Sequence, residues 1–366
     1  MKKKVAIIGT QGVPAHYGGF ESLVENIIGE FQSPDVEYTV FCSSQTMDRS
    51  LPRYKGANLK YIDVYPHGAR SILYDGLSIL KALRNFDAML ILGVSGCTLL
   101  PILKHFSKAR IIVNIDGHEY RRTKWGPLAR RFLKWSESCA VKHADTVVTD
   151  NKGIQQYVKQ TYGRNATLIA YGGNQALRDL SRDAQDLWLA KNGLTAGGYA
   201  LSICRIEPEN NCDLTLQACA ELGVPLVFVG NWGHSRYSQE LYERYQDHPD
   251  IHLLDSIYDL DILYTLRNNS LCYIHGHSAG GTNPSLAEAM FFNSPILCYD
   301  VVYNRETTFN KASYYSSVVA LKKLLNKYLT RHGRKSGQNL HRSPLPALAL
   351  RYYSWPVIAA HYESLY

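Results

Sequence analysis

Short apolar segments alternate with helical segments along the sequence, and the alternation repeats after a break. Val5–Gly9 predicts a strand that ends in glycine, and a helical pattern follows over Phe20–Phe31. The alternation continues to a helix over Lys152–Tyr162 and restarts with a strand over Tyr199–Cys204. Strands that alternate with helices form βαβ units and a parallel sheet, and ligands bind beyond the carboxyl ends of its strands. The sequence therefore predicts an α/β fold.

A polar stretch from Tyr171 to about Asp186 separates the two halves and reads as a linker. At 366 residues the chain is too long for one ordinary core, so we expect two domains. We predict two Rossmann-like domains facing across a cleft, over residues 1–175 and 176–349. The segment 350–366 carries a helical pattern, and we expect this helix to return to the N-terminal domain and pack on it.

The segment His275–Met290 is the most informative for function, and it follows an apolar strand. Gly280 and Gly281 allow the backbone to turn sharply and to approach a ligand closely. Asn283–Pro284 suits the start of a helix, and the free N–H groups of a helix start attract an anion such as a phosphate. Glu288 follows about one helical turn later. Amides for a diphosphate and a carboxylate for a sugar hydroxyl together indicate a nucleotide-sugar site.

The composition is ordinary for a soluble globular protein, with 45% apolar and 20% charged residues. We expect no signal peptide, because the apolar run Val5–Ile8 is too short. We expect no membrane-spanning helix, because the apolar stretch Ala88–Leu103 is interrupted by glycine and proline and falls short of ~20 residues. The 8 cysteines lack CxxC spacing, which favours reduced thiols in a cytoplasmic protein over disulfides or zinc.

The formal charge of +8 is partly local to the basic segment Glu119–Lys142. Apolar side chains are interleaved with its lysines and arginines, namely Trp125, Leu128, Phe132, Leu133 and Trp135. A basic amphipathic helix with tryptophans can lie on an anionic membrane. The alternative is a surface helix whose apolar stripe packs on its own domain, and the sequence leaves both open.

Five motifs stand in order along nearly the whole chain. They are Gly9–Glu21, Asn114–Glu119, Cys204–Asn211, His275–Met290 and Tyr353–Trp355. With them the chain resembles the retaining glycosyltransferases of family 4, which have the GT-B fold. It looks most like the β-1,4-rhamnosyltransferases that build bacterial surface polysaccharides.

The resemblance implies a set of donor-binding residues. The candidates are Gly18, Gly19, Arg205, Asn210, His277, Gly280, Gly281, Thr282, Asn283, Ser285 and Glu288. In this family the arginine matched by Arg205 neutralises the donor diphosphate, and a guanidinium fork suits phosphate oxygens. Glu288 matches a glutamate that usually holds the nucleotide ribose.

Three features also have a purely structural interpretation. Gly18 and Gly19 alone would suggest a plain βα turn, although a loop of this length exceeds the typical ~2–6 residues. Arg205 alone would suggest a surface salt bridge with Glu207 or Glu209. His275, at the strand end, would suggest a core histidine.

The chain departs from the family pattern at two positions. Asn210 stands where relatives carry a lysine, which removes one positive charge from the diphosphate site. Gly280 stands where many relatives carry a glutamate that touches the transferred sugar. This absence argues against a glucose- or mannose-type donor held in the usual way, and it is compatible with a 6-deoxy sugar such as rhamnose.

Asp116, His118 and Glu119 end a strand of the first half, where they would face the active site. The resemblance makes them the catalytic candidates, with Asp116 or Glu119 on acceptor hydroxyls and His118 on the donor sugar. Enzymes of this class are commonly thought to use no protein nucleophile, so charge stabilisation and placement matter most. The structural alternative for Asp116 is a helix cap.

We therefore expect a rhamnosyltransferase that moves L-rhamnose, with retention, from dTDP-β-L-rhamnose to a lipid-diphosphate-linked saccharide. Its partners would be the nucleotide diphosphate sugar, the lipid-linked acceptor and an anionic membrane surface, with the protein peripheral on the inner face of the cell membrane. A UDP- or GDP-linked donor and a nucleotide-sugar 2-epimerase-like activity remain alternatives. A noncatalytic binder of nucleic acid or membrane rests only on the charge, and we expect no nucleic acid partner.

We expect no cofactor and no metal. Asp259 and Asp261 form a literal DxD, a pattern that binds manganese in other glycosyltransferases. Acidic residues at a helix start are favoured by capping and by the helix dipole, so we interpret the pair as a cap.

Overall fold

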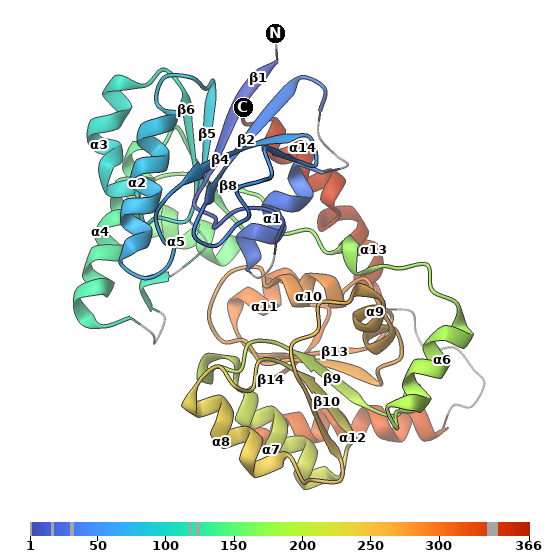
Figure 1. The fold of residues 1–366 in the computed structure, drawn as a ribbon. Coiled ribbons are helices and arrows are strands. Elements are labelled where there is room, and N and C mark those ends of the chain that lie inside the picture. The colour runs from blue at the N-terminus through green and yellow to red at the C-terminus, as the bar shows by residue number, and fades with distance from the viewer. Residues whose placement is uncertain are drawn as a thin grey trace. The chain divides into compact units, whose positions relative to one another are not determined.

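The computed structural model describes residues 2–15, 18–29, 33–115, 117, 119–121, 125–334 and 343–366. The chain divides into two compact units. The first unit contains Met1–Tyr171 and Ser354–Tyr366, and the second contains Gly172–Tyr353. Figure 1 shows a sheet covered by helices in each.

The sheet of the first unit has the strand order β3-β4-β2-β1-β5-β6-β7-β8. Its strands are β1 (Lys3–Ile8), β2 (Val36–Ser43), β3 (Arg53–Tyr54), β4 (Ala57–Ile62), β5 (Ala88–Leu92), β6 (Arg110–Asn114), β7 (Thr146–Thr149) and β8 (Thr167–Leu168). Its helices are α1 (Gly19–Ile27), α2 (Arg70–Ala82), η1 (Cys97–Leu99), α3 (Leu100–Leu103), η2 (Lys104–Phe106), η3 (Glu119–Arg121), α4 (Pro127–His143), α5 (Lys152–Tyr162) and α14 (Trp355–Glu363). The pairs are parallel except β3 with β4.

The sheet of the second unit has the order β11-β10-β9-β12-β13-β14, with parallel pairs. Its strands are β9 (Ala200–Ile203), β10 (Leu226–Val229), β11 (Ile251–Leu254), β12 (Cys272–His275), β13 (Ile296–Tyr299) and β14 (Ser313–Tyr315). Its helices are η4 (Asn174–Ala176), α6 (Arg182–Lys191), η5 (Pro208–Asn210), α7 (Cys212–Leu222), α8 (Arg236–Tyr245), α9 (Leu260–Asn268), α10 (Pro284–Ala289), α11 (Val302–Thr307), α12 (Val318–Arg334) and α13 (Leu345–Tyr352).

The central strands are continuously apolar in sequence, which allows both of their faces to be buried. Val5, Ala6, Ile7 and Ile8 in β1 are all fully buried, as expected of a parallel strand covered on both faces. β10 is likewise buried along its length in the second unit. These features confirm the predicted fold of parallel-sheet, Rossmann-like units.

The C-terminal helix α14 packs on the first unit, against α1, as the sequence predicted. Trp355, Ile358 and Tyr362 join the apolar core of that unit. The hydroxyl of Tyr362 accepts a hydrogen bond from Asn114 Nδ2 at 2.8 Å. The return begins at Ser354, because α13 still belongs to the second unit.

Two element boundaries differ from those predicted. The helix expected over Phe20–Phe31 ends at Ile27, just before a glycine at residue 29. The polar stretch expected to be a linker up to Asp186 already contains the start of α6, because Ser181 caps that helix by accepting from Ala184 N at 3.3 Å. A Ser N-cap satisfies an otherwise unpaired helix amide.

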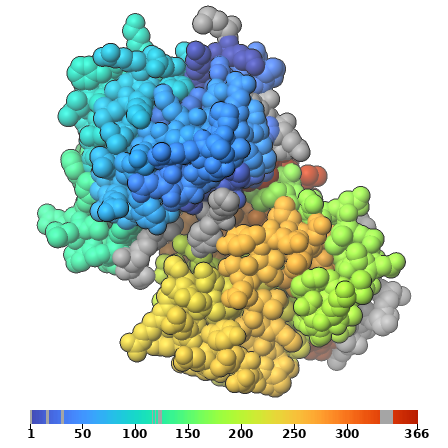
Figure 2. Space-filling model, viewed as in Figure 1, coloured from blue at the N-terminus to red at the C-terminus, as the bar shows by residue number. Residues whose placement is uncertain are grey.

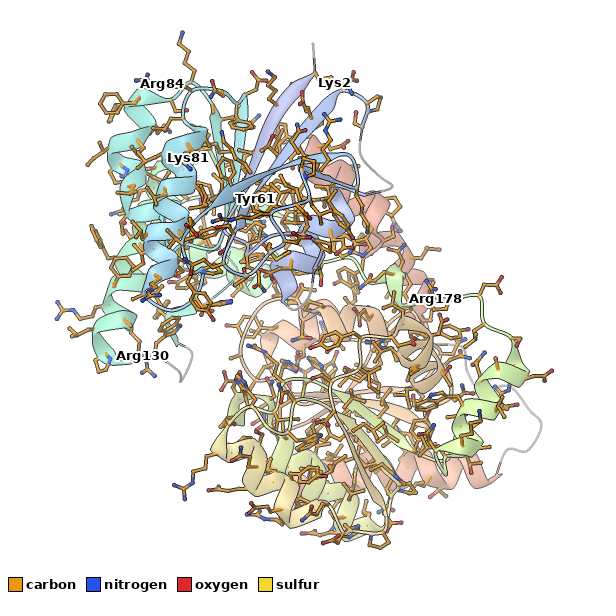
Figure 3. All side chains as sticks on the ribbon, in the orientation of Figure 1. Lys2, Tyr61, Lys81, Arg84, Arg130 and Arg178 are labelled. Atoms are coloured by element: carbon orange, nitrogen blue, oxygen red, sulfur yellow. The ribbon has the colours of Figure 1, made fainter. Side chains whose placement is uncertain are left out.

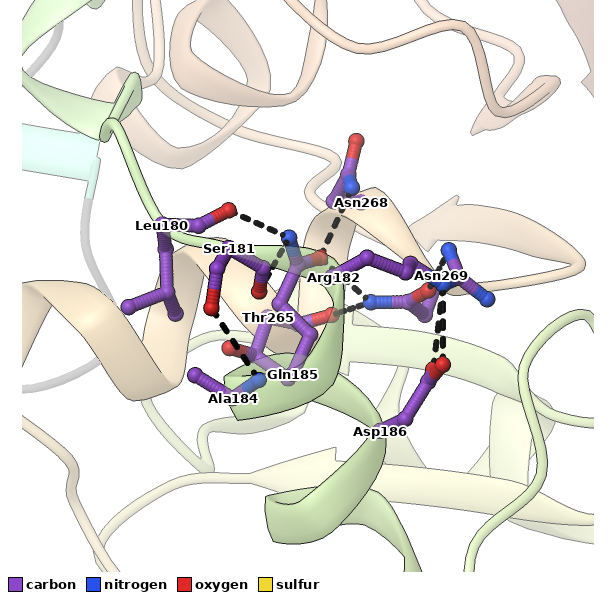
Figure 4. Close-up of polar contacts among 9 residues, drawn as sticks. All are labelled: Leu180, Ser181, Arg182, Ala184, Gln185, Asp186, Thr265, Asn268 and Asn269. Carbon is purple, nitrogen blue, oxygen red and sulfur yellow. Dashed lines mark hydrogen bonds and ion pairs between the residues drawn. The ribbon is translucent and has the colours of Figure 1, made fainter.

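Polar side chains tie α6 to α9 within the second unit (Figure 4). Gln185 Oε1 accepts from the amides of Asn268 and Asn269, each at 2.9 Å. Arg182 Nη1 donates to Asn269 Oδ1 at 2.9 Å. This network fixes the end of α9, the helix that also carries Arg267.

Candidate functional site

In the second unit, the strand order reverses between β9 and β12. β9 is the first strand of this sheet in the sequence and lies at its centre. It pairs with β10 on one side and with β12 on the other. The carboxyl ends of such strands form the crevice where open α/β sheets bind ligands. We call the two loops that follow these strands, residues 204–211 and 276–283, the β9–β12 edge.

Hydrogen bonds join the two loops of the β9–β12 edge. The backbone N–H and the hydroxyl of Ser278 both donate to the carbonyl oxygen of Glu209, at 2.9 and 2.8 Å. Asn211 Nδ2 donates to the carbonyl of Gly276 at 2.7 Å. A Cβ on Gly276 would stand 2.1 Å from the carbonyl oxygen of Asn210, so this close approach requires glycine.

Arg205 and Asn210 play different parts in the first of these loops. The Arg205 side chain is 41% exposed, and its Nη1 lies 3.5 Å from Glu207 Oε1. This contact is the salt bridge considered from the sequence, yet it is long and leaves the guanidinium open to solvent. Asn210 is buried, and its amide nitrogen donates to the Arg205 carbonyl at 2.8 Å. Asn210 therefore braces the loop that carries Arg205, and its expected contact to the donor stays a prediction.

The start of α10 has the predicted Asn283 cap. This cap occupies first-turn amides that were expected to be free to bind an anion. Asn283 Oδ1 accepts from both the N–H and the hydroxyl of Ser285, at 3.0 and 2.8 Å. Leu286 N donates to the Asn283 carbonyl at 3.1 Å. The expectation of free first-turn amides is thus wrong for Ser285 and Leu286.

The glycine turn before α10 offers amides instead. Gly280 has φ +120°, a conformation that favours glycine, and a Cβ there would meet no atom within 4 Å. Within the described part of the chain, the N–H groups of Gly280 and Gly281 make no hydrogen bond. Thr282 is buried beside them. The turn at Gly280 and Gly281 therefore presents two amides without a partner among the described residues, whereas the first-turn amides of α10 are bonded to Asn283.

Two buried histidines precede this turn, one at the end of β12 and one two residues later. His275 is 1% exposed, and neither ring nitrogen has a hydrogen-bond partner among the described residues. Burial lowers the pKa of His275 to about 3, so its ring stays neutral. His277 is also buried, and its ring stacks on that of His275 with centroids 4.3 Å apart. His275 is a core histidine, and Asn304 Nδ2 holds the His277 carbonyl at 2.8 Å.

Glu288 is anchored by two neighbours. Arg267, which is buried on α9, donates from Nη2 to Glu288 Oε2. Gln175 Nε2 donates to Oε1 at 2.7 Å. A Cβ on Gly173 would lie 2.8 Å from the backbone of Ala287 and Glu288, so the segment that leads into η4 and Gln175 runs close against α10. The carboxylate is held in one orientation, with part of its surface exposed.

In the first unit, a side chain of α1 stabilises the loop between β1 and α1 by hydrogen bonds. Glu21 Oε1 accepts from the Thr10 hydroxyl and from Gln11 N, each at 3.0 Å. Gly18 has φ +126°, and a Cβ there would stand 2.0 Å from Glu21 Oε2. Gly19 lies against the ring of Tyr171. Gly18 is thus required by the loop's own geometry, whatever ligand the loop binds.

Of the predicted catalytic residues, Asp116 and His118 lie outside the described residues. Glu119 opens η3 and accepts from Trp125 Nε1 at 3.0 Å. The structure therefore places one of the three, at the carboxyl-end side of β6.

The DxD motif has the predicted capping geometry. Asp259 Oδ1 accepts from the backbone N–H groups of Asp261 and Ile262, at 2.8 and 3.2 Å, at the start of α9. Asp261 forms an ion pair with Arg178 at 2.7 Å. Among the described residues there is no group of three or more His, Cys, Asp or Glu side chains arranged to hold a metal ion.

The basic segment forms η3 and α4. One face of α4 is buried within the first unit, with Leu133, Glu137 and Ala140 on it. The other face exposes Leu128 by 83% and Trp135 by 57%. Figures 1 and 2 show α4, in teal, at the surface of this unit. The buried face agrees with the interpretation of a helix that packs on its own domain, and the membrane interpretation stays a prediction. No helix among the described residues is both long and apolar enough to cross a membrane.

The residues that position Glu288 and Lys134 could not all be predicted from the sequence. No sequence pattern identifies Arg267 and Gln175 as partners of Glu288, because folding alone brings these residues into contact. Glu137 does carry a sequence signal, since an acidic residue four positions after Leu133 falls on the apolar stripe of the predicted helix. An acidic group on such a stripe must find partners in the core.

Comparisons with known proteins agree with this architecture. Residues 2–174 match a protein family described as a domain of unknown function, DUF1972. No match is found among curated protein sequences. The structure is similar to that of sucrose-phosphate synthase from Thermosynechococcus elongatus, with a TM-score of 0.82, 14% identity and coverage of 100% of this chain and 98% of that chain.

Two further solved structures cover nearly the full chain. Anabaena HepE in complex with UDP-glucose has a TM-score of 0.75 and 14% identity, with 99% of each chain covered. The α,α-trehalose 6-phosphate synthase of Burkholderia multivorans has a TM-score of 0.66 and 12% identity, and covers 100% of this chain and 98% of that chain. At these identities the likeness establishes the fold, which is of the GT-B type.

Proposed function

We propose that the protein is a glycosyltransferase whose second unit binds a nucleotide diphosphate sugar. One observation carries this proposal, the β9–β12 edge. It brings an exposed arginine, Arg205, and an open glycine turn, Gly280–Gly281, to the crevice where α/β sheets bind ligands. An arginine fork and unpaired backbone amides both suit phosphate oxygens.

The comparisons support the same ligand class. HepE, which shares this fold along nearly its whole length, is described in complexes with UDP and with UDP-glucose. The anchored carboxylate of Glu288 supplies an acceptor for sugar hydroxyls, because a carboxylate has about four lone-pair sites and its two protein partners leave some free. We assign Glu288 to the ribose of the donor.

In the proposed reaction the bond between the sugar C1 and the diphosphate oxygen breaks, and a bond from C1 to an acceptor hydroxyl oxygen forms on the same face. The released diphosphate takes the hydroxyl proton, so no protein nucleophile is needed. The task of the protein is to stabilise the negative charge that grows on the leaving diphosphate. Arg205 and the Gly280–Gly281 amides perform it.

We assign dTDP-β-L-rhamnose as the donor. Its sugar lacks the 6-hydroxyl, and Gly280 leaves open space where relatives carry a carboxylate. Retention from this donor gives a β linkage. The specificity rests on the sequence resemblance and on this missing carboxylate.

We assign the acceptor, a lipid-diphosphate-linked saccharide, to the first unit. Its candidates are Asp116 and Glu119, whereas Gly18, Gly19 and His118 remain candidates for contacts to the donor. The exposed Leu128 and Trp135 on α4 would rest on the anionic membrane that carries the acceptor. Leu128→Ser together with Trp135→Ser should weaken binding to anionic vesicles, whereas Leu187→Ser, an exposed leucine on α6, should not. Equal binding by all variants would reject the membrane contact.

An assay of nucleotide release tests the proposed reaction. The protein is incubated with dTDP-rhamnose, UDP-glucose or GDP-mannose, with and without a glucosyl-lipid acceptor. We expect acceptor-dependent release of dTDP, and a loss of this activity in Arg205→Gln but not in Arg236→Gln, an exposed arginine on α8. Acceptor-dependent release of UDP or GDP would support glycosyltransferase activity but reject rhamnose as the transferred sugar. Conversion of a donor without acceptor would favour an epimerase, and no turnover at all would reject the proposal.

A further inference from the structure

A pocket opens on the first unit between α4, η3 and the end of α5. Its volume is about 580 Å³, and its lining includes Arg130, Arg131, Lys134, Trp135, Tyr120 and Tyr162. Arg130, Lys134 and Ser138 follow one another at intervals of four along α4, so they share one helix face. We call this cavity the α4 pocket.

Lys134 is held in the α4 pocket by aromatic rings and a buried carboxylate. Its Nζ lies 4.7, 4.6 and 5.0 Å from the ring centroids of Tyr120, Tyr157 and Tyr162. It also lies 3.1 Å from Oε1 of Glu137, whose side chain is 2% exposed. An ammonium placed over aromatic faces is attracted by the ring quadrupoles.

The same carboxylate organises the tyrosines. Glu137 Oε1 accepts from the hydroxyl of Tyr162 at 2.6 Å and from that of Tyr157. Burial alone would lower the pKa of Lys134, but the Tyr162 hydrogen bond and the charge of Glu137 outweigh it and raise that pKa. Lys134 therefore stays charged, and its position is fixed before any ligand arrives.

The two arginines are not engaged in this way. Both Arg130 and Arg131 are exposed, and in the part of the chain that the structure describes neither guanidinium has an ion pair or a hydrogen bond to a side chain. Figure 3 labels Arg130 at the edge of the unit. Glu137 balances the charge of Lys134, whose ammonium is held in a fixed position. Arg130 and Arg131 therefore give the pocket a net positive charge.

The geometry points to the α4 pocket as a binding site for a phosphoryl group carried on a larger molecule. Two guanidinium forks and a fixed ammonium can surround the oxygens of a phosphate, each arginine by paired N–H donors. Trp135 and Tyr120 provide flat apolar walls for the part of the ligand that bears the phosphate. A pocket of this volume lies within the ~300–1,000 Å³ typical of small-molecule sites.

This inference does not depend on the proposed sugar transfer, since the α4 pocket belongs to the first unit and its ligand need not react. The phosphoryl group can come from two sources, a free sugar phosphate or the headgroup of a lipid. Both offer the same chemistry to the three cations. The experiment separates them.

The test measures binding of glucose 1-phosphate and inorganic pyrophosphate by titration calorimetry, in the full chain with Arg205→Gln so that the second unit does not contribute. Hydrogen exchange locates the site. We expect slower exchange over residues 127–138 and about tenfold weaker binding, or more, in Arg130→Gln/Arg131→Gln. The matched control, Lys81→Gln/Arg84→Gln, removes two positive charges from the end of α2, apart from Arg130 in Figure 3, and should bind as before.

A second arm uses vesicles of phosphatidylcholine with and without phosphatidic acid. Binding to the phosphatidic acid vesicles that needs Arg130 and Arg131, without binding of the free phosphates, would identify the lipid headgroup as the source. Binding of the free phosphates identifies a sugar phosphate. No binding in either arm, or equal loss in the α4 and α2 variants, would overturn the proposal.

Discussion

The guanidinium of Arg267 binds the carboxylate of Glu288 from a position in which only 3% of the arginine side chain is exposed. The two residues are far apart in sequence, on α9 and α10, and the α6–α9 network fixes the end of α9. A carboxylate held this way keeps one orientation toward a ligand. The pair therefore links the packing of the second unit to its proposed donor contact.

Arg267→Met should lower the free energy of unfolding by about 3 kcal/mol, because it leaves the partly buried Glu288 carboxylate without its counter-charge. Arg267→Met/Glu288→Gln should recover part of this loss, because both charges are then gone. Urea unfolding of the three proteins provides the comparison. If the double variant were no more stable than the single one, the ion pair would have no such role.

Glu288→Gln should reduce turnover by about a hundredfold, a loss of ~2.7 kcal/mol in transition-state stabilisation, in a variant that folds with reduced stability because the buried Arg267 loses its counter-charge. Glutamine keeps the shape of the side chain and removes the charge that binds the ribose hydroxyls. Steady-state kinetics with the preferred donor, and circular dichroism for the fold, measure the two effects. The control is Glu240→Gln, an exposed glutamate on α8. Full activity in Glu288→Gln would remove this residue from the donor site.

Gly18→Ala should destabilise the first unit by about 1–3 kcal/mol, because alanine disfavours the backbone conformation at φ +126° and its Cβ would strike Glu21. Gly193→Ala is the matched control, at φ +67° with no atom within 4 Å of the new Cβ. It should cost less, since only the backbone conformation is strained. Thermal unfolding compares the two, and equal losses would show that the contact with Glu21 is not tight.

Stability should depend on pH through Asp75, a buried residue of α2. Burial raises the pKa of this carboxyl from 3.8 to about 7, against a Ser95 hydrogen bond that lowers it. The folded pKa lies above the unfolded one, so the stabilising contribution is complete below pH 3.8 and is lost as pH rises through about 7. Asp75→Asn should remove this decline and be the more stable protein at about pH 8.

Urea unfolding at about pH 5 and about pH 8 measures the effect, and the free energy of unfolding should fall by roughly 3 kcal/mol between these two pH values, because only the part of the titration above about pH 5 is sampled. Asp35→Asn, an exposed aspartate of the same unit, should leave the pH dependence unchanged. A parallel pH profile in Asp75→Asn and the unaltered chain would show that Asp75 is ionised in the folded state.

The alternating pattern predicted the elements that build the two sheets, because buried parallel strands are apolar along their length. α5 has its predicted bounds, Lys152–Tyr162, where an asparagine cap and a final glycine mark both ends. α8 was not predicted, since its sequence is mostly polar and its contact with the apolar core comes from Leu241 and from the tyrosines Tyr237 and Tyr245. The early end of α1 at Ile27 shows that an apolar pattern alone does not locate a helix end.

Local chemistry at the candidate site was predicted better than long-range contacts. The Asn283 and Asp259 caps follow from short-range hydrogen bonding, and both are present. The partners of Glu288 depend on three separate segments of the fold, so no spacing in the sequence reveals them. The loss of the Ser285 amide follows from the same predicted cap, because an N-cap side chain accepts from the N–H two or three residues on and so competes with an anion for that donor.

A donor-bound crystal structure tests the central claim most directly. With dTDP-rhamnose or dTDP bound, we predict the diphosphate at Arg205 and the Gly280–Gly281 amides, and the ribose hydroxyls at Glu288. A nucleotide bound away from the β9–β12 edge, with Arg205 and Glu288 making no contact to it, would contradict the account.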